Sequence, residues 1–407
     1  MRVGYLSKKG CKYGQLDPTY ALVVFSPPNF QNQGETMIIE ERAYWVAFNH
    51  IRGVGSARVQ KMLKAFGNLR SAWEASRIRL MEAGLDGRTA EAIASGRPAL
   101  DPPALLSRCE KLGLRALIWE DPDYPPRLKE LPSPPPVLYL RGAVTETDGL
   151  AVAVVGTRKA TAYGREVTRM FASALAASGI TVVSGMARGI DAEAHHAALD
   201  RGGRTLAVLG CGADVVYPPE HERLARRIAE AGAILSDYAP GTPPDAANFP
   251  PRNRIIAGLA LATLVVEAGE ESGALLTACY AAEYGRDVFA VPGSILNAAS
   301  KGCNRLISDG AQPAIAPDEL IRALDIQRIA PAFQMRMVVP ESPVEAKILG
   351  ALSSEPLHID LLRASVGLPV ETVSGTLAVM ELKGMVRTVG GMHYVAAFPH
   401  DPEDHRK

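Results

Sequence analysis

Six short apolar runs alternate with helical segments between residues 151 and 291, and this alternation constrains the fold more than any other feature. The runs are rich in Val, Ile and Ala, as expected of strands buried on both faces of a parallel sheet. Right-handed helical crossovers between such strands give a doubly wound α/β sheet, which binds ligands beyond the carboxyl ends of its strands. The predicted strands are Ala151–Val155, Ile180–Val183, Thr205–Leu209, Ala233–Leu235, Thr263–Val266 and Val288–Val291, and the predicted helices include Arg165–Ser178, Glu220–Glu230 and Ala274–Glu283.

The first strand leads into a glycine turn with the features of an anion site. Gly156 allows a sharp turn, and Thr157 and Thr161 supply hydroxyl groups close to the start of the next helix. Unpaired amides at a helix N-terminus attract negative charge, and Arg158 and Lys159 add two full positive charges. The turn therefore predicts a phosphate cradle, although an ordinary strand-to-helix turn with solvated basic residues gives the same pattern.

Two further strand ends carry glycine loops, SGMARGID at residues 184–191 and GCG at residues 210–212. Ser184, Gly185 and Arg188 of the first loop are predicted to join the site. The dinucleotide fingerprint GxGxxG is broken at the first turn, where Arg158 and Thr161 stand at glycine positions, and no Gly-Lys pair forms a Walker A loop. The sequence therefore disfavours NAD and ATP and predicts no cofactor.

A cationic helix start lies further along the chain. Pro251 suits a first helical turn, and Arg252, Asn253 and Arg254 follow it, so that an anion is expected to compensate the charges at this end of the helix dipole. Lys301 opens another basic loop. The aromatic residues nearest these loops are candidates for base stacking, with core packing as the alternative: Phe249, Tyr217 and Phe289.

Composition sets limits on the function. The 407 residues carry 44 Lys plus Arg against 44 Asp plus Glu, so that any affinity for nucleic acid must come from a local patch. No apolar run approaches the roughly 20 residues that cross a bilayer, and the five cysteines contain no CxxC pair for zinc. We expect a soluble protein of the reducing cytoplasm with no metal site.

The flanks predict two smaller units. We expect a leader (1–36) that is disordered or lies upstream of the natural start, a helical domain (37–120), the α/β domain (121–325), a linker (326–343), a winged helix (344–397) and a tail (398–407). In the helical domain, Gly53-Val54-Gly55 joins two helices as in a helix-hairpin-helix unit, which grips DNA phosphates, although plain packing is the more common outcome. The presumed recognition helix of the winged unit carries Glu371, Glu381 and Lys383, so that it is net acidic and poorly suited to the major groove of DNA. This favours contact with a protein, or a simple capping role for the unit, over DNA binding.

The motifs VVGTR, SGMARGID, YPPEH, FPPRNRIIAGL, VVEAGEESGALLTA, FAVPG and KGCNRLI, in this order, resemble the DNA-processing protein A family, also called DprA or Smf. The resemblance covers about residues 124–311. It implies an extended Rossmann fold that binds single-stranded DNA, dimerises through the Rossmann domain, protects incoming strands during natural transformation and helps to load the RecA recombinase. It implies no catalysis. It also implies that residues 37–120 form a sterile-alpha-motif-like or helix-hairpin-helix domain, and it is compatible with a winged helix at the C-terminus. It places strand phosphates against Gly156, Thr157 and Arg158, with Arg188, Arg252, Asn253 and Arg254 as further walls.

Two other functions stay open at this point. The glycine loops are also similar to those of lysine-decarboxylase-like nucleotide phosphoribohydrolases, in which Glu267, Glu270 and Glu271 would be candidate acids, although the PGGxGT signature of that family is absent. A regulatory protein that docks partners through its winged unit and holds only a nucleotide in the Rossmann pocket is the third hypothesis.

Overall fold

A computed structural model describes residues 35–324, 342–352, 357–382, 385–388 and 391–396. The predicted leader (apart from residues 35 and 36), nearly all of the linker and the tail lie outside these residues. The chain divides into two compact units, residues 1–324 and 325–407. Among the described residues, no helix combines the length and the apolar character needed to cross a bilayer.

The first unit is built around a nine-stranded sheet with the order β1-β2-β6-β5-β4-β3-β7-β8-β9. The strands from β6 to β9 are parallel, whereas β2 pairs antiparallel with both β6 and β1. The strand bounds are β1 (Arg115–Ile118), β2 (Val137–Gly142), β3 (Ala151–Val155), β4 (Thr181–Ser184), β5 (Thr205–Val208), β6 (Ala233–Ser236), β7 (Ala262–Val265), β8 (Asp287–Ala290) and β9 (Gln312–Pro313). The predicted doubly wound α/β sheet is confirmed, and each of its six predicted strands lies within one residue of an observed one.

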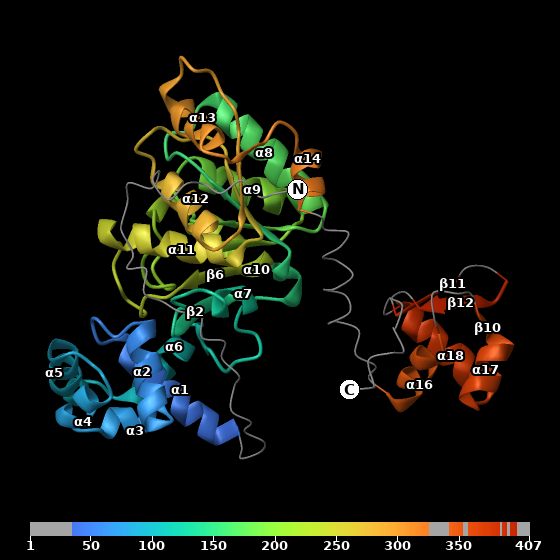
Figure 1. The fold of residues 1–407 in the computed structure, drawn as a ribbon, viewed down its shortest axis with the longest axis horizontal. Helices are drawn as coiled ribbons and strands as arrows, with labels where there is room; N and C mark the ends of the chain where they lie inside the picture. The colour runs from blue at the N-terminus through green and yellow to red at the C-terminus, as the bar shows by residue number, and fades with distance from the viewer. Residues whose placement is uncertain (1–34, 325–341, 353–356, 383–384, 389–390, 397–407) are drawn as a thin grey trace. The chain divides into compact units, whose positions relative to one another are not determined.

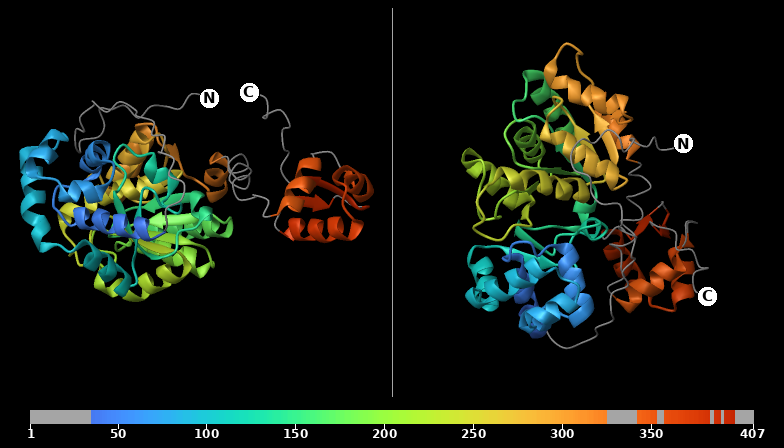
Figure 2. Two further views of the ribbon diagram at one scale, coloured as in Figure 1. Left: turned by 90° about the horizontal axis from the view of Figure 1, so that it is seen from below. Right: turned by 60° about the vertical axis from the view of Figure 1, so that its left-hand side comes forward.

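Helices cover both faces of the sheet (Figures 1 and 2). The helices α8, α9 and α10 pack against one another in one layer, and α7, α11 and α12 form the other layer. This division follows from the strand order, because right-handed crossovers change face when the order reverses at β3. The helix bounds are α7 (Pro126–Lys129), α8 (Ala162–Ala177), α9 (Ile190–Asp200), α10 (Glu222–Ala231), α11 (Phe249–Leu259), α12 (Gly273–Glu283), α13 (Lys301–Ser308) and α14 (Pro317–Ala323).

A small helical domain packs beside β1 and β2 at one end of the sheet (Figure 1). Its helices are α1 (Glu35–Asn49), α2 (Ser56–Phe66), α3 (Leu69–Glu74), α4 (Arg77–Glu82), α5 (Gly87–Gly96) and α6 (Pro102–Lys111). The buried Trp45 of α1 meets Trp119 edge to face at a centroid distance of 5.1 Å, and Asn49 accepts a hydrogen bond of 2.9 Å from the hydroxyl of Tyr139 in β2. One continuous core therefore joins this domain to the sheet.

The second unit has the helices and strands of a winged helix. They are α16 (Pro343–Ala351), β10 (Leu357–His358), α17 (Ile359–Val366), α18 (Val370–Leu382), β11 (Val386–Thr388) and β12 (His393–Ala396), and the sheet order is β10-β12-β11. On α18, Val373, Leu377 and Met380 are buried, whereas Val370, at the first position of the helix, is 39% exposed. Between its bounds α18 contains two glutamates and no basic residue.

One buried histidine predicts a pH dependence of stability. His195 of α9 is fully buried, its Nδ1 lies 2.7 Å from the hydroxyl of Thr205 in β5, and its Nε2 has no hydrogen-bond partner among the described residues. Burial lowers the pKa of His195 to about 3, below the usual value of 6.5. The unfolded chain therefore binds a proton that the folded chain does not bind between these two pH values.

We accordingly expect the free energy of unfolding to fall as the pH drops below about 6.5, by at most about 1.4 kcal/mol per pH unit from this residue. Urea titrations that follow tryptophan fluorescence between pH 7 and pH 4 measure this loss. His195→Gln removes the titrating group and should flatten the dependence, and an equally steep loss in that variant would contradict the assignment.

Candidate nucleic-acid interface

The carboxyl ends of β3 and β7 meet at the point where the strand order reverses, which is the usual ligand position of a doubly wound sheet. In this chain the position is filled by the protein itself. The amide of Thr157 donates a 2.7 Å hydrogen bond to the carbonyl of Glu267, just beyond β7. The turn at Gly156 is close enough that a Cβ there would lie 2.9 Å from this carbonyl and 2.5 Å from Ile190.

The side chain of Glu267 occupies the N-terminus of α8. It is 2% exposed, and its carboxylate accepts hydrogen bonds from the amide of Thr161 at 2.9 Å and from the hydroxyl of Thr161 at 2.8 Å. Gly164 leaves room for this carboxylate, since a Cβ there would approach Oε2 to 2.4 Å. The predicted row of free amides is therefore wrong for Thr157 and Thr161, because an internal carboxylate and carbonyl already satisfy these donors.

This arrangement also bears on the hydrolase hypothesis. Of its three candidate acids, Glu267 is enclosed and bound to Thr161, whereas Glu270 and Glu271 lie exposed in the following loop. The three carboxylates therefore do not converge on one buried site.

An aromatic and cationic cluster lies at the carboxyl ends of β3 and β5. Phe249, the first residue of α11, is partly exposed and packs over Gly210, where a Cβ would lie 2.9 Å from the ring. The guanidinium of the exposed Arg158 lies over this ring, with Cζ 5.2 Å from the centroid, and the partly exposed ring of Tyr217 is 5.7 Å away and tilted by 31°. The structure thus brings together three of the predicted residues, and Lys159 is exposed directly beside them.

Arg252 is buried below this cluster. It was predicted to line the wall of the groove, and the structure does not place it there. It is 4% exposed, and its Nη1 donates to the carbonyls of Gly185, at 2.8 Å, and of Val208. Burial lowers the pKa of Arg252, although the facing carboxylate of Asp191 opposes that change. The guanidinium therefore fastens the ends of β4 and β5 and supports Phe249, with its Cζ 5.8 Å from the ring centroid.

The side chains of Asn253 and Arg254 bind partners outside the cluster of Phe249, Arg158 and Tyr217. The amide nitrogen of Asn253 donates to the carbonyl of Gly273 at the start of α12, at 3.1 Å. Arg254 forms an ion pair of 2.7 Å with Asp237 beyond β6 and donates to the carbonyl of Ser133. Because β6 is three strands from β3, and neighbouring strands lie about 4.8 Å apart, this pair is separated from the Gly156 turn by roughly 14 Å. Arg254 therefore does not join Arg158 at one phosphate.

The remaining predicted residues divide between surface and interior. Arg188 is exposed and pairs with Glu220 at 2.5 Å, which raises the pKa of its guanidinium. Lys301 is exposed at the start of α13, where the next amide, that of Gly302, binds the carbonyl of Ala268 at 2.8 Å. Ser184 and Gly185 are buried, and the hydroxyl of Ser184 donates to Val154.

Of the two alternatives predicted for Phe289, base stacking and core packing, the structure shows core packing. It is 3% exposed in β8, between the backbones of Leu264 and Gln312, so that its ring is not available to a base. The structure adds two residues that sequence reasoning missed in these roles, Glu267 as an internal cap and Asp191 as the counter-charge of Arg252. Asp191 lies in the first turn of α9, and an acidic residue at that position was the only available signal.

Among the described residues, no group of three or more His, Cys, Asp or Glu side chains is arranged to hold a metal ion. The interface therefore consists of an aromatic pair, exposed cations and a rigid glycine turn. Such a surface can hold a polyanion that also carries flat rings.

This chain is similar to known proteins and domains of one family. A family model described as DNA recombination-mediator protein A matches residues 115–325, and a model of the DprA winged helix domain matches residues 338–392. The chain is 38% identical over 395 residues to the protein Smf of Synechocystis sp. (strain ATCC 27184), covering 88% of this chain and 99% of the relative. It is 44% identical over 192 residues to the DNA processing protein DprA of Streptococcus pneumoniae, covering 47% of this chain and 68% of that protein. The crystal structure of DprA from the same organism superposes with a TM-score of 0.61 and 33% identity, covering 69% of this chain and 97% of that one.

Proposed function

We propose that this chain, which belongs to the DprA/Smf family of DNA recombination-mediator proteins, binds single-stranded DNA across the carboxyl ends of β3 and β5. The observation that carries the proposal is the Phe249 ring, partly exposed and flanked by Tyr217 and the guanidinium of Arg158. Proteins hold single strands without sequence preference by combining cations that track the backbone with aromatic rings that stack on bases. Both elements are present within one short surface.

The roles of the side chains follow from their exposure and packing. Arg158 and Lys159 are exposed and reach phosphates, while Phe249 and Tyr217 offer ring surface to one or two bases, each worth about 1–3 kcal/mol. The backbone beneath them is fixed by the Glu267 cap and by Arg252, so that little freedom is lost on binding. Arg188, beyond the end of β4, and Lys301, at the start of α13, are further exposed cations that we assign to the same binding surface.

The family membership supports a wider role in the cytoplasm. We propose that the protein protects incoming strands during natural transformation, pairs with a second copy through the Rossmann unit and helps to load RecA onto the bound strand. No catalytic step belongs to this proposal. Sedimentation velocity of the full chain tests the homodimer, and RecA-dependent strand exchange on protein-coated oligonucleotides tests the loading.

Replacing Arg158 tests the binding surface. Arg158→Ala removes a phosphate contact and the cation above Phe249, so we expect the affinity for an oligothymidylate to fall roughly tenfold at moderate salt. The slope of log affinity against log salt should decrease by about 0.7, the value for one lost phosphate contact on a single strand. Fluorescence anisotropy across a salt series measures both quantities.

Arg226→Ala is the matched control, because Arg226 is 68% exposed on α10 and carries the same charge outside the cluster. The control should leave the salt slope close to that of the parent chain. Equal slopes for the parent chain and Arg158→Ala, or equal affinities for the oligomer and a mononucleotide, would reject the proposed surface.

A further inference from the structure

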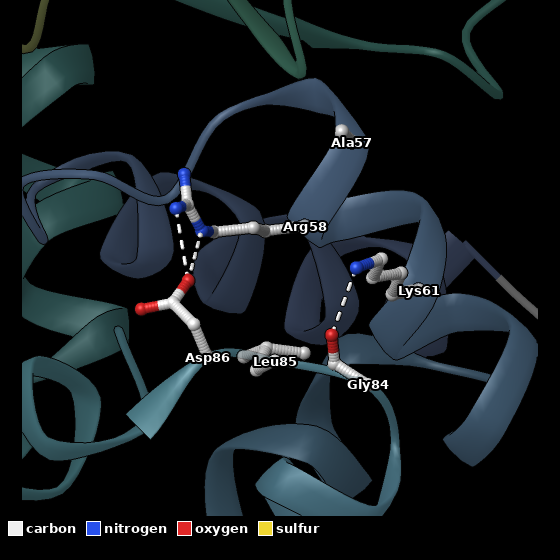
Figure 3. A pocket seen from close by; sticks show the side chains of 6 residues that line it. All are labelled: Ala57, Arg58, Lys61, Gly84, Leu85 and Asp86. Carbon is white, nitrogen blue, oxygen red and sulfur yellow. Dashed lines mark hydrogen bonds and ion pairs between the residues drawn. The ribbon is translucent and has the colours of Figure 1, made fainter. Parts of the chain in front are cut away.

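The helical domain contains a hollow of about 420 Å³ whose polar groups satisfy one another (Figure 3). Arg58 of α2 donates a hydrogen bond to Asp86 at 3.0 Å, and Lys61 donates to the carbonyl of Gly84 at 2.8 Å. Each cation thus already has an acceptor inside the protein. A surface of the opposite kind, with exposed side chains that the protein leaves uncovered, lies at the carboxyl edge of the sheet.

The loop between β8 and α13 carries, at residues 295 and 296, the two most exposed large apolar side chains of the described residues. Ile295 is 81% exposed and Leu296 is 91% exposed. We call this pair the apolar tip. In Figures 1 and 2 the loop, in orange, projects beyond α13. Single exposed apolar residues are common on protein surfaces, whereas adjacent ones on a projecting loop mark a site of contact.

Hydrogen bonds hold this loop in a defined shape. At its base, Gly293 and Asn304 of α13 exchange two bonds, 3.1 Å from the amide of Gly293 to Oδ1 and 3.0 Å from Nδ2 to the carbonyl of Gly293. Nearer the end of the loop, the hydroxyl of Ser294 accepts a bond of 3.3 Å from the amide of Leu296. The apolar tip is therefore presented by a preformed turn, so that little conformational entropy is lost when it is covered.

An exposed ring and a cation accompany the apolar tip. Tyr163, in the first turn of α8, is 51% exposed, and its hydroxyl donates a bond of 3.1 Å to the carbonyl of Pro292 at the base of the loop. It follows Lys159 of the proposed single-strand surface by four residues, and the exposed Lys301 stands at the other end of the loop. The loop thus combines apolar side chains, a ring and a cation, as the surface around Phe249 does.

The apolar tip and the Phe249 cluster lie on the same edge of the sheet. The cluster is at the end of β5, and β8 is four strands away in the order β5-β4-β3-β7-β8. Four spacings of about 4.8 Å amount to roughly 19 Å. At the spacing of one strand of a duplex, about 3.4 Å per nucleotide, roughly six nucleotides cross this distance, and a stretched strand needs fewer. A single strand held at Arg158 therefore reaches the loop.

The charges beside the loop are of mixed sign. Glu270 and Glu271 are exposed in the adjoining loop after β7, where a Cβ on Gly269 would lie 3.5 Å from the carbonyl of Ala298. These carboxylates offset the charge of Lys301. A field of mixed sign attracts phosphates weakly, so that the loop suits the bases of a strand better than its backbone.

We propose that Ile295, Leu296 and Tyr163 form a second contact with the bases of the single strand, at the β8 end of the edge that carries Arg158. The inference rests on the single-strand function proposed above and extends the path of the strand beyond β3 and β7. Aliphatic side chains insert between neighbouring bases in other DNA-bound proteins, and a tyrosine ring stacks on any base. The contribution of this contact is apolar and does not depend on salt.

The test measures the affinity of full-chain variants for an oligothymidylate of about sixteen nucleotides, by anisotropy across a salt series. We expect the double variant Ile295→Ser/Leu296→Ser to bind roughly tenfold more weakly with an unchanged salt slope, because no phosphate contact is lost. Tyr163→Ala should lower the affinity about fivefold, whereas Tyr163→Phe, which keeps the ring, should not. Ile78→Ser is the control, because Ile78 is 67% exposed on α4 of the helical domain.

An abasic oligomer of the same length separates bases from backbone. The parent chain and the double variant should bind it equally, since it offers no base to the apolar tip. Both substituted side chains lie in solvent, so that the double variant is expected to fold. Sedimentation velocity of the double variant shows whether the apolar tip instead contacts a second copy of the chain.

Three results would overturn the inference: an affinity of the double variant for the oligothymidylate equal to that of Ile78→Ser, an equal loss on the abasic oligomer, or a change from dimer to monomer that accompanies the loss. Arg158→Ala separates this inference from the proposed function. A loss in Arg158→Ala alone rejects the apolar tip and keeps the surface around Phe249. A loss in the double variant alone rejects that surface and keeps the apolar tip.

Discussion

Glu267→Ala is expected to lower the free energy of unfolding by about 3 kcal/mol, because it leaves two donors of the half-buried Thr161, its amide and its hydroxyl, without an acceptor. The vacated space has the character of an anion site, at the N-terminus of the sixteen-residue helix α8. Inorganic phosphate should therefore raise the melting temperature of the variant more than that of the parent chain, at matched ionic strength. The affinity for single strands should also fall, since the turn that carries Arg158 loses its anchor.

Glu270→Ala provides the control for this prediction, because Glu270 lies exposed in the same loop and the substitution changes the charge equally. Its unfolding should be close to that of the parent chain, in phosphate as in chloride. Thermal unfolding followed by circular dichroism measures both effects. A Glu267→Ala variant as stable as Glu270→Ala would show that the cap contributes little.

Arg252→Ala is expected to destabilise the protein by about 3–5 kcal/mol, which is the usual cost of leaving a buried charge without its partner. The substitution removes the donor of the Gly185 and Val208 carbonyls and leaves the buried carboxylate of Asp191 facing no cation. Arg252→Lys keeps the charge and loses the planar fork, so that it should recover only part of the stability. Urea titrations that follow tryptophan fluorescence measure the differences.

Arg254→Ala distinguishes this role from that of a groove wall. Its ion pair with Asp237 is partly exposed, with side-chain exposures of 18% and 15%, and its loss should cost less than that of Arg252. If Arg252 is structural, the salt slope of single-strand binding in the folded Arg252→Lys variant should equal that of the parent chain. A lower slope in that variant with unchanged stability would instead return Arg252 to the phosphate site.

The sequence predicted the six strands from β3 to β8 accurately, because each of them is a short apolar run whose pattern is local, whereas β1 and β9 were not predicted. The run at residues 151–155 is buried along its whole length, as a parallel strand with helices on both sides must be. The same local logic found the glycine turn, Arg158 and the cationic start of α11. It found Phe249 and Tyr217 by their closeness to loops, and Phe289 by the same criterion, although Phe289 is a core residue. Closeness in sequence to a loop does not determine which way a ring points.

Successive helical residues project about 100° apart, so that Arg252, Asn253 and Arg254 could not all face one ligand. The structure sends them to the sheet interior, to α12 and to Asp237. This division could have been predicted from helical geometry. The partners could not, because Gly185, Gly273 and Asp237 come from distant parts of the chain.

The sequence by itself determined the doubly wound sheet, the family and the turn AVAVVGTRKATAYG that carries Arg158. Only the tertiary structure decided what fills the point between β3 and β7. The sequence pattern left an anion site open there. The fold instead brings Glu267, which is distant in sequence but follows the neighbouring strand β7, to the start of α8. The physical reason is that a backbone hydrogen-bond donor pairs with whichever acceptor the fold places beside it. Parallel pairing of β3 with β7 places the buried carboxylate of Glu267 beside Thr161, at the start of α8. The site that the structure leaves for a ligand is therefore the exposed surface around Arg158 and Phe249.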